Sequence, residues 1–115
     1  MPGSASASVT RGSRVVHGRA GRDVPFRLGV LVSGRGTNLQ AIFDAVARGE
    51  LQAEVALVVC NHRDAGAIGR AERAGVPVEV HEMRAYPSRL AQQQAIVARL
   101  EEAGVDLVVC AGWDR

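Results

Sequence analysis

The sequence predicts an α/β fold: an open, mostly parallel, Rossmann-like sheet with helices on both faces. Short apolar segments alternate along the chain with segments whose apolar residues recur at helical spacing. The apolar segments also lack strict polar alternation, which is typical of parallel strands covered on both faces. With 115 residues, the chain is expected to form one small domain, whose sheet ends after its fourth strand.

The N-terminal region is rich in Ser, Gly and Arg and shows no hydrophobic periodicity, so we expect a disordered tail at residues 1–26. It lacks the apolar centre of a secretory signal. Its Arg-rich, acid-poor composition is loosely similar to that of an organelle transit peptide. A disordered extension, or a start site assigned too early, is the preferred interpretation. The folded part is then expected at residues 27–115.

A strand is expected at residues 27–32, followed by a glycine turn and a helix at about residues 38–48. The apolar positions of this helix are spaced i, i+3, i+4 and i+7: Leu39, Ile42, Phe43 and Val46. A second strand is expected at residues 55–60. The second helix is expected to begin with Asp64 as its N-cap and to end near Ala74.

The third strand is expected at residues 77–81 and the fourth at residues 105–110. The helix between them is expected to run from its N-cap, Ser88, to Ala103. A glycine follows each predicted helix: Gly49, Gly75 and Gly104. Ligands of such sheets bind beyond the carboxyl ends of the strands, so one rim should carry the site. The segments expected at that rim are residues 33–38, 61–64, 82–89 and 111–115.

The most distinctive motif, Ser-Gly-Arg-Gly-Thr-Asn at residues 33–38, joins the first strand to the first helix. A helix start carries unpaired N–H groups and a partial positive charge. Glycines let the backbone approach an anion closely, and Thr37 and Asn38 add side-chain donors. The motif therefore predicts a phosphate site, with a tight turn that binds nothing as the alternative.

Two common nucleotide-binding motifs do not fit this loop. The phosphate loop of nucleoside triphosphatases requires a lysine, and the chain contains none. The dinucleotide motif requires a third glycine, where this chain has Leu39, and an acidic residue after the second strand, where it has Asn61. A mononucleotide or a sugar phosphate remains as the expected ligand.

Composition narrows the class of partner. Residues 28–115 carry nine Arg and eleven acidic residues, so we expect no nucleic-acid partner. No apolar segment is long enough to span a membrane, and a cytoplasmic location is expected. Cys60 and Cys110 each end a predicted strand and are expected to be small core residues, neither disulfide-bonded nor metal-binding. No metal site is predicted.

From residue 27 to residue 115 the chain resembles the N-terminal half of the phosphoribosylglycinamide formyltransferase family, folate-dependent enzymes of purine synthesis. The most specific match is the loop Ser33-Gly34-x-Gly36-Thr37-Asn38-Leu39-Gln40. Further matches fall in the family's order at compatible spacing: Asn61, Asp64-Ala65, Ala74-Gly75, Ser88-Arg89 and Ala111-Gly112-Trp113. The resemblance implies transfer of a formyl group from 10-formyltetrahydrofolate to the amine of glycinamide ribonucleotide.

The resemblance also implies roles for individual residues. It assigns the phosphate of glycinamide ribonucleotide to three residues of the loop: Gly36, Thr37 and Asn38. It assigns a folate contact to Arg89, since an arginine can bind a glutamate carboxylate in a forked pair. Asp114 and Arg115 fall at the start of the folate-pocket segment. Asp114 replaces an apolar residue, often Met, and a carboxylate beside a pterin is costly to desolvate.

The same resemblance places the catalytic Asn, His and Asp beyond Arg115, so residues 1–115 alone are expected to be inactive. His62 lies on the predicted rim and His81 ends the third predicted strand. No nucleophile–base pair with recognisable spacing supports either histidine as catalytic. The family usually has a polar or cationic residue without a catalytic role at the position of His62.

Other functions remain open at this point: a catalytically inert phosphate-binding module, a formyltetrahydrofolate hydrolase and a methionyl-tRNA formyltransferase. The loop at residues 36–38 favours the glycinamide ribonucleotide enzyme over the last two, because neither handles the same small sugar phosphate. The acidic balance of the folded part also argues against tRNA binding. Strand edges left uncovered after the fourth strand predict self-association.

Overall fold

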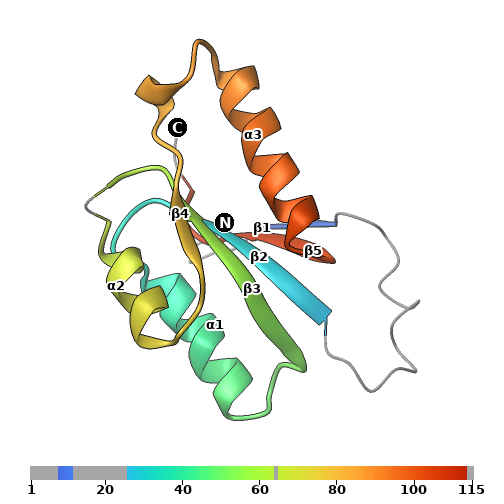
Figure 1. The fold of residues 1–115 in the computed structure, drawn as a ribbon. Helices are drawn as coiled ribbons and strands as arrows, with labels where there is room; N and C mark the ends of the chain where they lie inside the picture. Colours follow the sequence, from blue (N-terminus) through green and yellow to red (C-terminus); the bar gives the residue numbers. More distant parts are fainter. Residues whose placement is uncertain (1–7, 12–25, 64, 114–115) are drawn as a thin grey trace.

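The computed structural model describes residues 8–11, 26–63 and 65–113, which form one five-stranded sheet and three α-helices (Figure 1). The strands are β1 (Ser8–Arg11), β2 (Phe26–Val32), β3 (Ala53–Cys60), β4 (Val78–Val80) and β5 (Leu107–Cys110). The helices are α1 (Thr37–Ala47), α2 (Gly66–Arg73) and α3 (Arg89–Glu102), with a short 3-10 helix, η2 (Met83–Ala85), before α3.

The sheet is mostly parallel, as predicted, and its order is β1-β5-β2-β3-β4. Strand β2 pairs in parallel with β3 and β5, and β3 pairs in parallel with β4. From β2 the chain moves outward to β3 and β4, and then returns to β5 on the other side of β2. This reversal between β2 and β5 is the topological switch point, where open α/β sheets bind their ligands.

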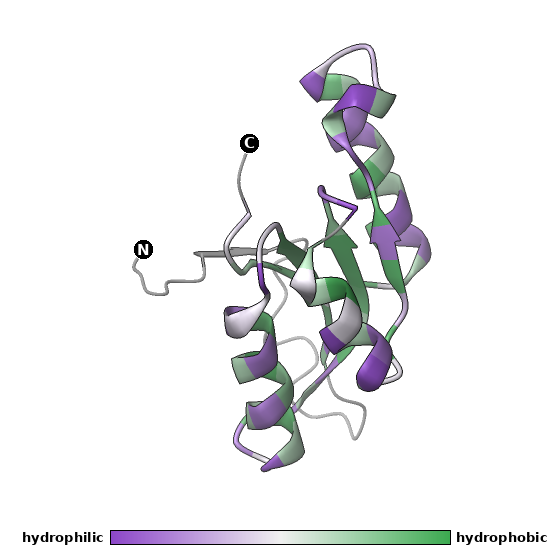
Figure 2. Ribbon diagram, turned by 90° about the vertical axis from the view of Figure 1, so that its left-hand side faces the viewer, coloured by the Kyte–Doolittle hydropathy of each residue, from purple (hydrophilic) through white to green (hydrophobic). Residues whose placement is uncertain are grey.

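Helices cover both faces of the sheet, which confirms the second part of the predicted fold class. Helices α1 and α2 lie on one face and α3 lies on the other (Figure 1). The core under α1 and α2 is built from Val30, Val32, Leu39, Val58, Cys60, Ala67, Ala71 and Ala111. The core under α3 is built from Leu57, Val59, Ile96 and Leu100. Figure 2 shows that β2 and β3 are almost entirely hydrophobic, whereas each helix mixes hydrophobic and hydrophilic residues.

Helix ends mostly follow the sequence signals. The Ser88 side chain accepts a hydrogen bond from the Ala91 N–H at 3.1 Å, which confirms the predicted cap of α3. The glycines predicted to follow the helices all have positive φ: Gly49, Gly75 and Gly104. Helix α2 differs, because its N-cap is Ala65, which has no side-chain cap, while the predicted cap Asp64 lies outside the described residues.

The expected disordered tail at residues 1–26 is wrong for two described segments. Ser8–Arg11 form β1, which pairs antiparallel with β5, and Phe26 is the first residue of β2. The physical reason is that β5 has an open edge, whose unpaired backbone groups accept another strand. A tail without periodicity carries no sign of such a distant partner. Its other residues lie outside the described ranges.

Cys60 is fully buried in the core under α1 and α2, as predicted, whereas Cys110 is only half-buried. Burial raises the pKa of the Cys60 thiol to about 11, so this thiol stays protonated at neutral pH. Among the described residues, no helix is both long and apolar enough to cross a membrane.

Candidate functional site

The loop after β2 and the turn after β5 meet at the switch point. Ser33 is buried, and its backbone N–H donates to the carbonyl oxygen of Gly112 at 3.1 Å. The N–H of Ala111 donates to the carbonyl of Leu31 at 2.8 Å, which continues the β2–β5 pairing up to this point. The two segments therefore lie side by side and form one continuous hydrogen-bonded surface at the carboxyl edge of the sheet.

Gly36 is the residue that lets the loop turn into α1. Its φ is +84°, and a Cβ at this position would lie 2.7 Å from the Cα of Ala67. The loop is also tied to α2, because Arg70 Nε donates to the carbonyl of Arg35 at 2.8 Å and the Ala67 N–H donates to the carbonyl of Gly34 at 3.4 Å. Only glycine combines this backbone conformation with so close a helix.

The N-terminus of α1 is open. Its first helical hydrogen bond runs from the Gln40 N–H to the carbonyl of Gly36 at 2.8 Å, so the N–H groups of residues 37–39 have no helical acceptor. Its N-cap, Gly36, has no side chain to cap it, and its first turn holds no acidic residue. Thr37 is exposed and Asn38 is half-buried beside Gly112. This arrangement suits an anion, as the motif predicts.

A pocket of about 360 Å³ opens on the neighbouring side of the same loop. Its lining comes from the loops after β2 and β3: Ser33, Gly34, Arg35, His62, Ala65 and Gly66. None of the three predicted phosphate residues lines it, and the Asn38 side chain lies beside Gly112. The sequence placed His62 on the rim correctly, but it contained no signal for the pocket.

The loops after β3 and β4 join the same rim. Arg63 forms an ion pair with Glu82 at 3.1 Å, and this guanidinium holds the pKa of the Glu82 carboxyl below its ordinary value. The backbone N–H of His81 donates to the carbonyl of Cys60 at 2.7 Å. The expected rim is thus confirmed for its described parts: residues 33–38, 61–63, 82–89 and 111–113.

Arg89, the predicted folate contact, is the first residue of α3. Its side chain is exposed, and it makes no hydrogen bond or ion pair with another described residue. Asp114 and Arg115, the other two predicted folate residues, lie outside the described residues. Across the described ranges, no three His, Cys, Asp or Glu side chains gather closely enough to hold a metal ion.

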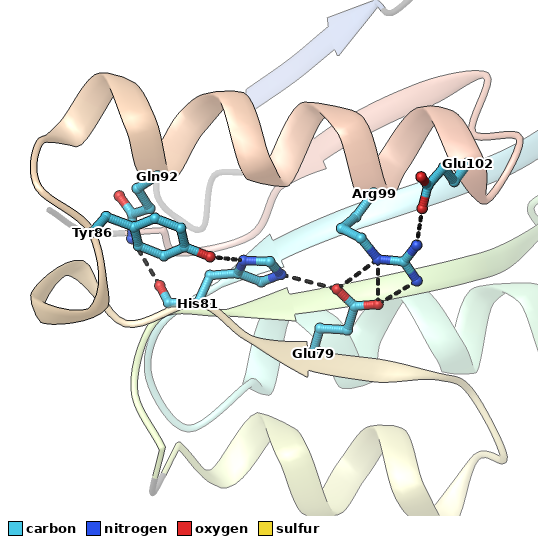
Figure 3. Close-up of polar contacts among 6 residues, drawn as sticks. All are labelled: Glu79, His81, Tyr86, Gln92, Arg99 and Glu102. Carbon is cyan, nitrogen blue, oxygen red and sulfur yellow. Dashed lines mark hydrogen bonds and ion pairs between the residues drawn. The ribbon is translucent and has the colours of Figure 1, made fainter.

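Sequence reasoning missed a polar cluster between β4 and α3 (Figure 3). We call it the His81 cluster, and its members are Glu79, His81, Tyr86, Gln92, Arg99 and Glu102. One signal was present: Gln92 stands four residues before Ile96 and eight before Leu100, on the core-facing side of the predicted helix. A polar residue at such a position needs a partner, which identifies a candidate contact without naming it.

Comparison with known proteins assigns the chain to a family. The family model described as formyl transferase matches residues 26–115. The chain belongs to the formyl transferase family. The match covers β2 to β5 and all three α-helices, so the whole predicted α/β domain is a formyl transferase segment.

Two similar proteins carry different names, and the chain covers only part of each. The chain is 39% identical over 87 residues to the phosphoribosylglycinamide formyltransferase of Haemophilus influenzae, covering 76% of this chain and 41% of that relative. It is 37% identical over 89 residues to the human trifunctional purine biosynthetic protein adenosine-3, covering 77% of this chain and 9% of that relative. The chain therefore spans less than half the length of these relatives.

Solved structures support the fold independently. Glycinamide ribonucleotide transformylase 1 of Geobacillus kaustophilus superimposes with a TM-score of 0.77 at 44% identity, over 79% of this chain and 48% of that one. The enzyme of the same name from Symbiobacterium toebii gives a TM-score of 0.78 at 46% identity, over 82% and 44%. The described formyl transferase fold is thus the N-terminal architecture predicted from the sequence.

Proposed function

We propose that this protein takes part in purine biosynthesis as a glycinamide ribonucleotide formyltransferase, and that residues 27–115 supply its substrate-phosphate half. The observation that carries the proposal is the open N-terminus of α1 at the β2–β5 switch point. The names of the relatives support the choice of a small sugar phosphate over other anions. The cytoplasm is the proposed location, as expected from the sequence.

In this proposal the ribonucleotide phosphate accepts hydrogen bonds from three residues: Gly36, Thr37 and Asn38. Gly36 places the backbone close to the anion, and the other two residues add N–H groups and side-chain donors. The helix dipole adds a favourable interaction with the negative charge. The chain has no lysine, so in this proposal backbone N–H groups and neutral side chains stabilise the phosphate charge that a lysine stabilises in other phosphate sites.

The proposed formyl donor is 10-formyltetrahydrofolate. Arg89 would bind its glutamate carboxylate, which is supported by the exposed guanidinium and by its lack of an ion pair with other described residues. Asp114 and Arg115 would begin the pocket for the pterin. The carboxylate of Asp114 is the one proposed contact that opposes burial of an apolar ring system.

The proposed reaction forms a bond between the substrate amine nitrogen and the formyl carbon, and breaks the bond from that carbon to N10 of the folate. The proton lost from the amine nitrogen goes to N10. Such a reaction needs a group that stabilises charge on the formyl oxygen and a group that moves the proton. Following the resemblance, we assign both tasks to residues beyond Arg115, and binding and orientation to residues 27–115.

The phosphate site is tested by titrating the purified protein with glycinamide ribonucleotide in a calorimeter. Asn38→Ala removes one donor to a charged group, which costs about 1.5–3 kcal/mol, so the affinity should fall by about 10- to 150-fold. Asn38→Asp keeps the size of the side chain, and its negative charge stabilises the helix start while repelling phosphate. This variant should therefore unfold at a slightly higher urea concentration and bind no measurable ribonucleotide.

The matched control is Gln94→Ala, which changes an exposed amide on α3, far along the chain from the loop. It should leave the affinity for ribonucleotide unchanged. Equal affinities for the parent protein and Asn38→Asp would remove this loop from the site. Tight binding by the native full-length protein, without any formyl transfer from 10-formyltetrahydrofolate, would favour an inert phosphate-binding module over an enzyme.

A further inference from the structure

The position of Arg89 depends on how the first turn of α3 is held. Arg89 follows the N-cap Ser88 directly and makes no contact of its own with a charged or polar group among the described residues. Its guanidinium therefore points wherever the helix start directs it. A small rotation of α3 about its far end would displace this side chain more than any other part of the helix.

The buried apolar residues of α3 in the described part of the chain lie in its later turns. Ile96 and Leu100 are buried in the core under this helix, whereas Leu90 in the first turn is 61% exposed. The core-facing position nearest to Arg89 is taken by Gln92, which is only 5% exposed. Its side-chain N–H donates to the carbonyl oxygen of His81 at 2.8 Å. A buried hydrogen bond thus takes the place of an apolar contact at this end.

The ring of His81 connects two further segments (Figure 3). Its Nε2 lies 2.9 Å from Glu79 Oε1, and its Nδ1 lies 2.7 Å from the hydroxyl oxygen of Tyr86. Because an ionised carboxylate only accepts, we assign the ring proton to Nε2, which leaves Nδ1 to accept from the Tyr86 hydroxyl. The two rings also lie nearly parallel, with planes 13° apart. Tyr86 belongs to the short connection that leads into α3.

Glu79 connects the His81 cluster to a later turn of α3 through Arg99. Arg99 donates to both of its carboxylate oxygens at 2.6–3.1 Å, and Arg99 also pairs with Glu102 one turn further along α3. The Arg99 guanidinium, with a smaller contribution from His81, holds the pKa of Glu79 below its ordinary value, so this carboxyl stays ionised at neutral pH. The end of β4 therefore contacts α3 at two residues, Gln92 and Arg99. It also contacts Tyr86, which lies in the connection between β4 and α3.

We propose that His81, Tyr86 and Gln92 are positioning residues that fix Arg89 for the carboxylate of the folate co-substrate, an inference that rests on the proposed function. The three residues join the end of β4, the connection and the first turn of α3 into one unit. Their side-chain hydrogen bonds run among themselves and to Glu79, with none to the described loop at residues 33–38, so we expect their contribution to concern the co-substrate and not the ribonucleotide.

The test is a pair of calorimetric titrations of the purified protein, one with 10-formyltetrahydrofolate and one with glycinamide ribonucleotide. Tyr86→Phe removes one hydroxyl and keeps the ring stacked on His81. It should raise the Kd for the folate by about 3- to 10-fold, the range of one net hydrogen bond, and leave the Kd for the ribonucleotide unchanged. Gln92→Ala should show the same split, whereas its exposed neighbour variant, Gln93→Ala, should change neither Kd.

The double variant Arg89→Ala/Tyr86→Phe separates this inference from the proposed function. If Tyr86 acts through Arg89, its substitution adds no further loss of folate affinity once Arg89 is gone. An unchanged folate Kd for Arg89→Ala alone would remove Arg89 from the proposed site, and the positioning role with it. A large effect of Arg89→Ala, together with a Tyr86→Phe effect that is absent, additive, or equal for both ligands, would overturn only the positioning role.

Discussion

Gly36 combines two constraints in one residue, and they can be separated experimentally. Its φ of +84° lies in the left-handed region, which costs an L-residue about 1–2 kcal/mol. A Cβ at this position would also lie 2.7 Å from the Cα and 2.8 Å from the Cβ of Ala67 in α2. Gly49 has a similar φ of +76° with open space around its missing Cβ. An alanine at either position would therefore meet the same backbone strain, but only at position 36 would it also clash with α2.

Gly36→Ala should destabilise the protein by the backbone strain plus the cost of moving α2 away from the loop. Gly49→Ala should show the backbone strain alone, about 1–2 kcal/mol. Urea unfolding followed by circular dichroism measures both free energies of unfolding. Equal losses for the two variants would mean that α2 yields without cost, and that the close contact with the loop is not a constraint.

At the scale of elements, the ion pair between Glu79 of β4 and Arg99 of α3 makes the stability of the fold depend on pH. The folded-state pKa of Glu79 is lowered, chiefly by Arg99. A lowered pKa stabilises the fold fully above the unfolded value near 4.5, and this stabilisation is lost as the pH falls through the folded value. The ion pair should therefore support α3 at neutral pH and weaken under acid conditions.

Glu79→Gln should reduce the loss of melting temperature between pH 6 and pH 3, because the variant has no proton to gain at this position. The matched control is Glu102→Gln, which removes the more exposed carboxylate that pairs with the same Arg99. Its melting curve should keep nearly the full acid dependence of the parent protein. Scanning calorimetry measures the melting temperatures. An identical acid dependence in all three proteins would exclude Glu79 as the source of this dependence.

The sequence predicted the elements well because their signals are local. Apolar spacing located the four parallel strands and three helices, and Ser88 and the glycines at positions 49, 75 and 104 marked helix ends. The motif of the proposed phosphate site was recognisable for the same reason, since residues 33–38 are contiguous. The His81 cluster was not predictable, because its contacts join residues whose meeting depends on how α3 lies against β4. The identity of a helix face can be deduced from spacing, but its partner cannot.

At the scale of the whole molecule, the two edges of the sheet differ. One edge is β1, which pairs with β5, and the other is β4, which has only three residues. A short edge strand offers few free backbone groups, which limits pairing with other chains. Val80 on β4 is nevertheless 40% exposed. The self-association expected from the sequence remains a prediction, and β1 is now the element that most directly opposes it.

Removing residues 1–11 should uncover the edge of β5 and increase self-association, since β5 would present unpaired N–H and C=O groups. Removing residues 1–7 retains β1 and should leave the association state unchanged. Sedimentation velocity over a range of protein concentrations measures the difference. A shortened chain without β1 that sediments as a monomer and melts like the parent would show that β1 does not protect this edge.

The hydrogen bond between Ser33 and Gly112 has a consequence for how the proposed binding site forms during folding. It joins the loop after β2 to the turn after β5, which lie at opposite ends of the formyl transferase segment, so the proposed site has a high contact order. A peptide that contains only β2, the loop and α1 carries the whole predicted phosphate motif but lacks the turn after β5. Under the proposed function, capture of the ribonucleotide during refolding should therefore appear only in the phase in which β5 docks, which would make the ligand a kinetic marker for completion of the sheet.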